Sequence, residues 1–349
     1  MTASDTRTRL VKCVVWDLDN TLWQGTLLEE PVRSLRPGVA HVVRALDRRG
    51  ILHSIASRND HDLAMAKLRE FGLEEFFLCP QINWSPKSSS IQAVARALNI
   101  GTDSLAFVDD EVFERDEVMF SLPEVLCVSA LETAALLERS EFTPPVVTDD
   151  AGRRRLLYRA DQVRRTAEDE FAGPKEEFLA TLDMTLRITP AGEHDLLRAQ
   201  ELTVRTNQLN TTGYTYSYEE LDRFRRSGSH KLLMARLDDR YGPYGNVGLA
   251  LVETGAGEWT IKLLLMSCRV MSRGVGTVVI NHLRSLARRA GVRLVAEFVP
   301  TDRNRMMYVS YKFNRFQEIE RRDGLVRLEA DLDDVPPPPS YVRLEAGEG

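Results

Sequence analysis

Short apolar runs alternate with amphipathic stretches over the first 140 residues of the chain. The apolar runs cover residues 11–17, 51–57, 76–80, 104–110 and 125–129. The stretches with helical spacing of apolar residues cover 39–50, 60–72, 87–99, 113–121 and 131–139. Strands separated by helices are typical of a parallel sheet, because each crossover helix must pack back onto it. The pattern therefore predicts an α/β, Rossmann-like domain over residues 1–140.

The pattern changes after this segment. Residues 141–183 contain a proline and acid linker followed by a charged helix with sparse apolar positions, which favours a solvated connecting helix. From 184 to 333, helices and longer, antiparallel-looking strands surround one glycine turn, which predicts a separate α+β domain. Residues 334–349 include four consecutive prolines, and we expect a loose tail there.

Composition excludes several classes of protein. The 349 residues carry a formal charge of −6, which argues against a nucleic-acid binder, because phosphate affinity needs an excess of lysine and arginine. There is no apolar run of about 18 residues and no signal-like N-terminus, so we expect a cytoplasmic protein without a membrane partner. The four cysteines form no CxxC pair, which indicates neither a disulfide framework nor a zinc site.

Acidic residues follow two of the predicted strands in the first domain. The stretch VVWDLDNTLW places Asp17 and Asp19 at the end of the first strand, and AFVDDE places Asp109 and Asp110 at the end of the fourth. Ligands of open α/β sheets gather at the carboxyl ends of strands. Carboxylates crowded at one edge repel one another unless a cation lies among them, and such hard oxygen ligands suit Mg²⁺.

Two further polar residues occur at the same predicted edge. Ser57 ends the second strand, and Lys87 begins the third helix. A hydroxyl and an ammonium group there can stabilise the charge that spreads over phosphoryl oxygens. A carboxylate can attack phosphorus while a second acid, two residues on, protonates the leaving oxygen. The combined set predicts phosphoryl chemistry.

The ordered DxDxT, Ser, Lys and Asp-Asp motifs resemble the haloacid dehalogenase (HAD) superfamily of phosphatases. The resemblance implies that Asp17 is the nucleophile, that Asp19 is the acid/base, and that Thr21, Ser57 and Lys87 serve the phosphate. It also implies a Mg²⁺ ion held by Asp17, the backbone carbonyl of Asp19 and Asp109, with Asp110 nearby. The intervals between the motifs are too short for an inserted cap domain, so water exclusion and substrate selection must come from elsewhere.

The second domain has its own candidate site in LLLMSCRVMSRGVG. Gly274 and Gly276, preceded by Arg269 and Arg273, are expected to present backbone N–H groups at a helix start, which suits a pyrophosphate or phosphopantetheine arm. Cys268 lies close to both arginines, which favours the thiolate form and a nucleophilic role. A half-buried structural thiol explains the same position equally well.

The order of strand, RGVG turn, long helix and strand resembles the Gcn5-related N-acetyltransferase (GNAT) fold, although Met271 stands where that family usually has Gln or Arg. Both halves together closely resemble the FkbH-like proteins of polyketide pathways. This resemblance implies a glyceryltransferase/phosphatase that takes 1,3-bisphosphoglycerate, removes phosphate, holds the glyceryl group as a thioester on Cys268, and passes it to the phosphopantetheine thiol of an acyl carrier protein.

Further candidates in the second domain have structural alternatives. His282 and Glu297 are possible bases for thiol exchange, and Asn207 and Asn304 are possible hydrogen-bond donors to the acyl group or arm. Cap, turn or packing roles explain each of them as well. Two other functions remain open at this stage: a plain HAD phosphatase whose second domain only binds a carrier or substrate protein, and a scaffold with a degenerate site.

Overall fold

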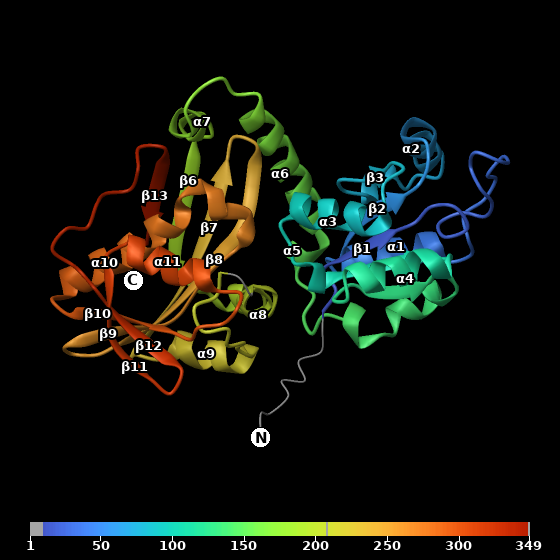
Figure 1. The fold of residues 1–349 in the computed structure, drawn as a ribbon. Helices are drawn as coiled ribbons and strands as arrows, with labels where there is room; N and C mark the ends of the chain where they lie inside the picture. The colour runs from blue at the N-terminus through green and yellow to red at the C-terminus, as the bar shows by residue number, and fades with distance from the viewer. Residues whose placement is uncertain (1–9, 207–208, 348–349) are drawn as a thin grey trace. The chain divides into compact units, whose positions relative to one another are not determined.

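The computed structural model describes residues 10–206 and 209–347, and the chain divides into two compact units, Met1–Arg159 and Ala160–Gly349 (Figure 1). The division falls inside helix α6 (Arg154–Asp169), so one continuous helix contributes to both units. Over the described residues, every helix is too short or too polar to cross a membrane.

The first unit contains a five-stranded parallel sheet with strand order β3-β2-β1-β4-β5. Its strands are β1 (Cys13–Trp16), β2 (Leu52–Ser57), β3 (Gln81–Ile82), β4 (Leu105–Asp109) and β5 (Leu126–Ser129). Strand β1 lies in the centre. The chain adds β2 and β3 on one side of it and then returns to add β4 and β5 on the other side, so the strand order reverses between β1 and β4. The carboxyl ends of these two strands are therefore the place where a ligand is expected.

Helices cover both faces of this sheet. They are α1 (Val39–Arg48), α2 (His61–Glu70), α3 (Lys87–Leu98), α4 (Val112–Ser121) and α5 (Asp149–Gly152), with 3-10 segments η1 (Glu74–Phe76), η2 (Thr102–Ser104), η3 (Ala130–Leu137) and η4 (Ser140–Phe142). Alternate residues of a strand point to opposite faces. Accordingly, Val14 and Trp16 pack in the cluster with α1, while Cys13 and Val15 pack in the cluster with α3 and α4. The predicted parallel α/β domain is confirmed.

Two predicted elements of the first unit differ from the pattern. The apolar run at 76–80 is not a regular strand; it only bridges His53 to Phe77, and the paired strand β3 comes after it. Cys79 has a φ of 49° and Pro80 lacks an N–H donor, so extended pairing cannot continue through them. The helix predicted over 131–139 is the 3-10 segment η3.

The second unit contains an eight-stranded mixed sheet with order β11-β12-β10-β9-β8-β7-β6-β13. Its strands are β6 (Met184–Pro190), β7 (His230–Asp239), β8 (Gly242–Thr254), β9 (Glu258–Met266), β10 (Arg293–Phe298), β11 (Phe316–Arg322), β12 (Leu325–Ala330) and β13 (Val342–Ala346). The pairs β9/β10 and β6/β13 are parallel, and the other neighbours are antiparallel. The predicted α+β character is confirmed.

Helices also cover both faces of the second sheet. They are α7 (Lys175–Thr181), α8 (Leu196–Arg205), α9 (Tyr218–Arg226), α10 (Val275–Ala290) and α11 (Arg305–Phe313), with 3-10 segments η5 (Glu193–Asp195) and η6 (Cys268–Arg273). Helices α7, α10 and α11 share the larger apolar cluster, and α8 and α9 share the smaller one. Strand β7 contributes to both apolar clusters. Leu233 and Ala235 lie in the larger cluster, and Leu232 and Met234 lie in the smaller one.

The expected loose tail is wrong for part of its length. Strand β13 pairs in parallel with β6, from Val342 opposite Met184 to Ala346 opposite Ile188, and Val342 is buried. The segment after the prolines alternates apolar and polar residues, which is the pattern of a strand with one covered face. The proline run therefore precedes an ordered edge strand of the sheet.

The connecting helix is also not the solvated helix that its charge suggests. Along α6, Arg154, Tyr158, Asp161 and Arg164 are all buried, at the three- and four-residue spacing of one helix face. Polar side chains can occupy such a face when each finds a partner. Arg154 donates to the Gly50 carbonyl at 2.8 Å in the first unit.

Arg164 is a fully buried cation of the second unit with partners on every side of its guanidinium. Its Nε and Nη2 donate to both oxygens of Asp239 at 2.8 and 2.9 Å, its Nη1 donates to Asp161 at 2.8 Å, and Nη2 also donates to the Gly242 carbonyl at 2.8 Å. The guanidinium lies 3.8 Å from the centre of the Tyr244 ring. This network attaches α6 to the turn between β7 and β8.

Replacing Arg164 with Met tests this attachment. The variant leaves Asp239 and Asp161 buried without their cation, which costs about 3–5 kcal/mol when one partner of a buried pair is removed. We expect that loss in the free energy of unfolding of the second unit, measured by urea unfolding with hydrogen exchange of β7 and β8 peptides. The control is Arg322→Ala, since Arg322 and Asp323 form an exposed pair that contributes at most about 1 kcal/mol. Equal shifts in the two variants would contradict the role of Arg164.

Candidate active site

Three carboxylates meet at the carboxyl edge of the first sheet. Asp17, directly after β1, and Asp109 and Asp110, at the end of β4, each offer one oxygen, and these oxygens all lie within 4.8 Å of one another. The placement follows from strand register, because Trp16 pairs with Val108 and the Asp17 N–H donates to the Val108 carbonyl at 2.9 Å. Asp17 and Asp109 are buried. The structure thus brings together the acids expected from the two strand ends.

Lys87 reaches this cluster from the first turn of α3. Its Nζ donates to Asp17, lies 3.2 Å from Asp109 Oδ2, and donates to the Ala56 carbonyl at 2.9 Å. The side chain is buried. Burial alone lowers the pKa of Lys87, but Asp17 and Asp109 outweigh this effect and raise it, so the ammonium form is maintained.

One lysine does not neutralise three carboxylates. Burial, and then the charge of Asp17, raise the pKa of Asp109 to about 6. Asp109 Oδ1 accepts a hydrogen bond from the Glu111 N–H at 2.8 Å, whereas the buried Oδ2 accepts none among the described residues. A buried oxygen that shares one lysine with Asp17, together with surplus negative charge, fits a divalent cation with oxygen ligands, and Mg²⁺ is such a cation.

Asp19 lies apart from this cluster and is held by other groups. Its Oδ1 accepts hydrogen bonds from Trp23 Nε1 at 2.7 Å and from the Leu27 N–H at 3.0 Å, and its Oδ2 accepts one from Asn59 Nδ2 at 2.9 Å. Burial raises the pKa of Asp19 despite these bonds. Sequence reasoning missed Asn59, although it follows the β2 end by only two residues. A metal contact through the Asp19 carbonyl stays a prediction.

Thr21 and Ser57 complete the predicted set in different ways. Thr21 is fully buried and forms a two-way link with Asp110: its hydroxyl donates to Asp110 Oδ1 at 3.1 Å and accepts from the Asp110 N–H at 3.1 Å. It therefore orients Asp110. Ser57 is the last residue of β2 and is buried, adjacent in sequence to Ala56, whose carbonyl binds Lys87.

Cys268 begins the 3-10 segment η6, between strand β9 and helix α10, and is half-buried. The predicted order of strand, cysteine turn, glycine and helix is therefore present. Gly274 joins η6 to α10 with a φ of 73°, and a Cβ there would lie 2.8 Å from the Tyr341 hydroxyl. Both the backbone angle and the close approach require glycine at this position.

The two arginines of this turn are engaged inside the unit. Arg269 Nη2 donates to the Tyr244 carbonyl at 2.8 Å. Arg273 is buried, its Nη1 donates to Glu168 Oε2 at 2.7 Å, and its guanidinium lies over the Phe178 ring at 5.7 Å. Both side chains fix the turn that carries Cys268. A direct contact of Arg273 with a bound arm would require its pair with Glu168 to open.

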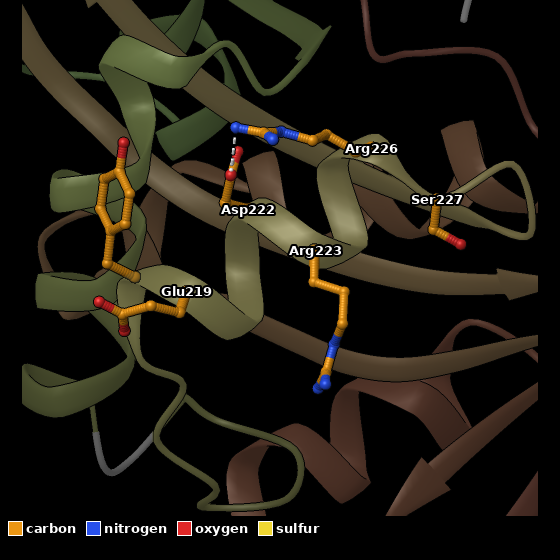
Figure 2. A pocket seen from close by; sticks show the side chains of 6 residues that line it. Glu219, Asp222, Arg223, Arg226 and Ser227 are labelled. Atoms are coloured by element: carbon orange, nitrogen blue, oxygen red, sulfur yellow. Dashed lines mark ion pairs between the residues drawn. The ribbon is translucent and has the colours of Figure 1, made fainter.

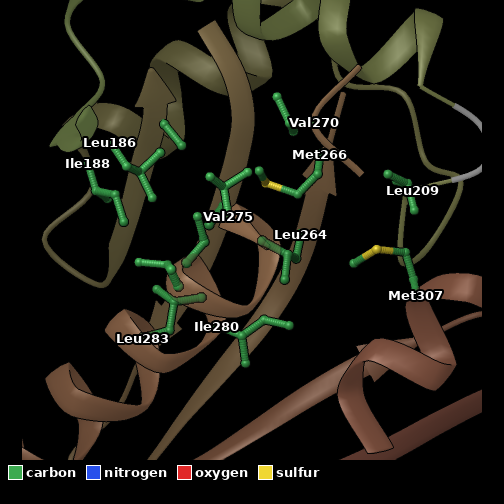
Figure 3. Packing of buried hydrophobic residues seen from close by; sticks show 14 of the residues in the cluster. Leu186, Ile188, Leu209, Leu264, Met266, Val270, Val275, Ile280, Leu283 and Met307 are labelled. Carbon is green, nitrogen blue, oxygen red and sulfur yellow. The ribbon is translucent and has the colours of Figure 1, made fainter. Parts of the chain in front are cut away.

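A small pocket of about 100 Å³ lies at the start of α10. Gly274 and Gly276 form part of its wall, and the rest is mainly apolar, with Leu264 and Met266 from β9 and Met307 from α11, besides the hydroxyl residues Thr277 and Ser310. Figure 3 shows Leu264, Met266 and Met307 together with Ile280 of α10. The glycines predicted to receive an arm thus border a narrow, mainly apolar pocket.

The remaining candidates of the second unit occupy structural positions or lie elsewhere. Asn304 is buried, and its Nδ2 donates to the carbonyls of Asn210 at 3.0 Å and Val299 at 2.9 Å. His282 lies on α10 seven residues after Val275, about 10 Å along the helix, and burial lowers its pKa. Glu297 forms an ion pair with Lys262. Asn207 lies outside the described residues.

Residues 27–114 match the family model of the haloacid dehalogenase-like hydrolases. The matched range includes Ser57, Lys87, Asp109 and Asp110 and begins after Asp17. No curated protein matches the chain. The match confirms the predicted HAD-like hydrolase domain in the first unit and, with it, the prediction that the chain is an enzyme.

Solved structures with similar parts include a phosphatase and acetyltransferases. The N-terminal part of BF1531 from Bacteroides fragilis, which contains a phosphatase domain complexed with Mg, is 27% identical with a TM-score of 0.31; the match covers 43% of this chain and only 40% of that one. The ribosomal-protein-S18-alanine N-acetyltransferase of Escherichia coli is 15% identical, with a TM-score of 0.33. That match covers 41% of this chain and 90% of the acetyltransferase chain. The GNAT domain of S. lividans PAT is 19% identical, with a TM-score of 0.34, and the match covers 41% of this chain and 88% of that domain's chain.

The crowded carboxylates lead to a stability prediction for Asp109→Asn. Because folding raises the pKa of Asp109 from 3.8 to about 6, the ionised group destabilises the fold above pH 6 and has no such effect below pH 4. At pH 7.5 without divalent cations, the variant should raise the free energy of unfolding of the first unit by about 1–3 kcal/mol.

Urea unfolding at several pH values checks this prediction. The advantage of the variant should disappear as the pH falls from 7 to 4, and added Mg²⁺ should stabilise the wild type more than the variant. The control is Asp116→Asn, because Asp116 is exposed on α4. A variant less stable than the wild type at pH 7.5 would contradict the interpretation.

Proposed function

We propose that the protein is a Mg²⁺-dependent phosphatase joined to an acyltransferase. The observation that carries the proposal is the group of Asp17, Asp109 and Lys87, all buried, with the half-buried Asp110 at the carboxyl edge of the first sheet. This arrangement combines a carboxylate nucleophile, a cation for the phosphoryl oxygens and a surplus of negative charge for a metal. The match of residues 27–114 to HAD-like hydrolases supports the same reading.

In the phosphatase half, Asp17 attacks the phosphorus of a phosphate ester. The P–O bond to the substrate breaks, and the phosphoryl group is transferred to the Asp17 carboxylate as an acyl phosphate. Lys87 and Ser57 bind the phosphoryl oxygens. Water then attacks the phosphorus, releases inorganic phosphate and restores Asp17. When bound, Mg²⁺ would be held by Asp17, Asp109 and Asp110 and would offset negative charge on the phosphate.

Asp19 is the proton carrier of this half. It gives its proton to the leaving oxygen and takes one from the attacking water. Its raised pKa suits the first step, since a larger share of the carboxyl is protonated near neutral pH. Trp23, Leu27 and Asn59 hold the carboxyl in one orientation. Asn59 is therefore a positioning residue for Asp19.

In the acyltransferase half, Cys268 is the nucleophile. The sulfur attacks the carbonyl carbon of an acyl phosphate, the C–O bond to phosphate breaks, and a thioester forms as phosphate leaves. The thiol of an incoming arm then attacks the thioester and loses its proton, and Cys268 recovers a proton as its thiol is restored. The arm would run past Gly274 and Gly276, where the pocket has space for a narrow chain.

The substrate and partner come from the resemblance to FkbH-like proteins. We propose 1,3-bisphosphoglycerate as the donor and the phosphopantetheine thiol of an acyl carrier protein as the acceptor, in a polyketide pathway. The donor carries both an acyl phosphate and a phosphate monoester, so one molecule contains a suitable group for each half. The alternative is a plain Mg²⁺-dependent phosphatase whose second unit only binds a carrier or substrate protein.

Intact-mass measurement separates the two functions. Wild-type protein incubated with 1,3-bisphosphoglycerate should gain a covalent glyceryl or phosphoglyceryl adduct, and Cys268→Ala should gain none, because the thioester needs the sulfur. Cys127→Ala, a half-buried cysteine of β5, is the matched control and should be acylated like the wild type. Phosphate release without any adduct on the wild type would support the plain phosphatase instead.

Asp17→Asn tests the first half. Phosphate release from a monoester such as 3-phosphoglycerate or p-nitrophenyl phosphate should fall by a factor on the order of 10³ or more, since an amide cannot act as the nucleophile. Asp116→Asn, at an exposed position of α4, is the control and should keep its activity. Acylation of Cys268 by an acyl phosphate should survive in Asp17→Asn. Retained phosphate release would refute Asp17 as the nucleophile.

A further inference from the structure

Helix α11 exposes one well-defined face. Its residues Arg305, Met306, Val309, Lys312 and Phe313 are all exposed. At 100° per residue they lie within an arc of about 120°. Phe313 is 83% exposed, Met306 49% and Val309 46%, which is unusual for large apolar side chains gathered on one helix face. The opposite face carries Met307 and Tyr311, which are buried in the core of the unit.

This face is basic as well as apolar. Residues 303–316 contain four arginines or lysines and no acid, in a chain whose net charge is −6. Among the described residues, Arg305 and Lys312 form no ion pair, whereas Arg315 pairs with Asp334 at 3.0 Å. Glu318 on the neighbouring strand β11 pairs with Arg321 at 2.8 Å, and Lys312 acts on the same carboxylate at longer range. Two cations thus border the apolar side chains without a direct ion pair among the described residues, so they can pair with carboxylates of a partner.

The same helix forms part of the pocket wall. Met307 and Ser310 line the pocket together with Gly274 and Gly276. On the helix, Ser310 lies next to Met306 and Phe313 in angular order, so the exposed face borders the pocket. Met271, also a pocket residue, is 40% exposed. Figure 3 shows Met307 on α11 beside the β9 side chains of the pocket. A partner on α11 would therefore lie at the pocket.

We propose that this face of α11 is the docking surface for an acidic carrier protein, whose arm enters the neighbouring pocket. The identity of the arm rests on the proposed function. Arg305 and Lys312 would pair with carboxylates of the partner, and Met306, Val309 and Phe313 would contact its apolar side chains. Charge complementarity of this kind speeds association and fixes orientation. A patch of five side chains supports a transient complex, as a carrier that must leave after each transfer requires.

Other arginine-rich segments fit this role less well. Figure 2 shows the surface pocket on α9, where Arg223 and Arg226 alternate with Glu219 and Asp222. Arg226 pairs with Asp222 at 2.6 Å, so the α9 surface is mixed in sign. The arginines of α6 bond internally, to carboxylates or carbonyls of their own unit; they include Arg154, Arg155, Arg159 and Arg164.

The test is a binding measurement with a purified acyl carrier protein of net negative charge, in its holo form and in its apo form without the arm. Fluorescence anisotropy gives the Kd at about 50 and 300 mM salt. The double variant Arg305→Glu/Lys312→Glu should weaken binding of both forms at least about tenfold at low salt. Phe313→Ser should weaken binding at both salt concentrations. The matched control, Arg223→Glu/Arg226→Glu on α9, should stay within about twofold of the wild type.

Each outcome has a defined meaning. Wild-type affinity in the α11 variants, or an equal loss in the α9 control, would overturn the proposal. Binding of the face to a second copy of this chain, seen by sedimentation, or to anionic phosphatidylglycerol vesicles with no carrier binding, would overturn it too. Circular dichroism and retained phosphate release show that the variants are folded. Acylation of Cys268 by 1,3-bisphosphoglycerate is measured separately, so failure of the proposed function is distinguishable from failure of the docking surface.

Discussion

The first unit depends on the contact of one buried ammonium group with the carboxylates at its sheet edge. Parallel pairing of β1 with β4 puts Asp17 and Asp109 side by side whatever their charge, because register is set by the apolar residues before them. Lys87 offsets part of the repulsion, and it can do so because it begins a helix whose next turns are anchored in the core. The site therefore concentrates negative charge at the edge of a well-packed sheet.

The second unit contains a comparable buried network, but its cation is bonded within the fold. Arg164 is bonded by Asp239, Asp161 and a backbone carbonyl, so its charge is matched within the fold. Such a network stabilises the fold because its polar groups are hydrogen-bonded to one another. As a consequence, little charge is left for a ligand. At the first site, the buried Asp109 Oδ2 lies 3.2 Å from the Lys87 ammonium, which also serves Asp17, and the pKa of Asp109 is raised. Asp161 also has a buried oxygen and a raised pKa, but Arg164 and Arg269 both act on it, whereas Lys87 faces the three carboxylates Asp17, Asp109 and Asp110 at the first site.

The sequence predicts the parts of the structure that follow from periodicity and strand ends. Both sheets and the meeting of Asp17 with Asp109 and Lys87 could be anticipated, since carboxyl ends of parallel strands share one edge. The buried face of α6 could not, because its members Arg154, Asp161 and Arg164 are polar and apolar patterning does not detect them. The pair of Arg273 with Glu168 joins residues 105 positions apart, which no local pattern reveals.

The absence of space for a cap raises the question of how water is excluded from the phosphatase site. The exposed fractions of Asp17, Lys87 and Asp109 are only 7%, 4% and 1%, all within the first unit. These groups are thus already shielded by the sheet edge and the helix starts around it, without a lid. Burial strengthens their mutual interactions and raises the pKa of Asp19 and Asp109. What a cap would otherwise supply is then substrate selection, which must come from groups outside this buried cluster.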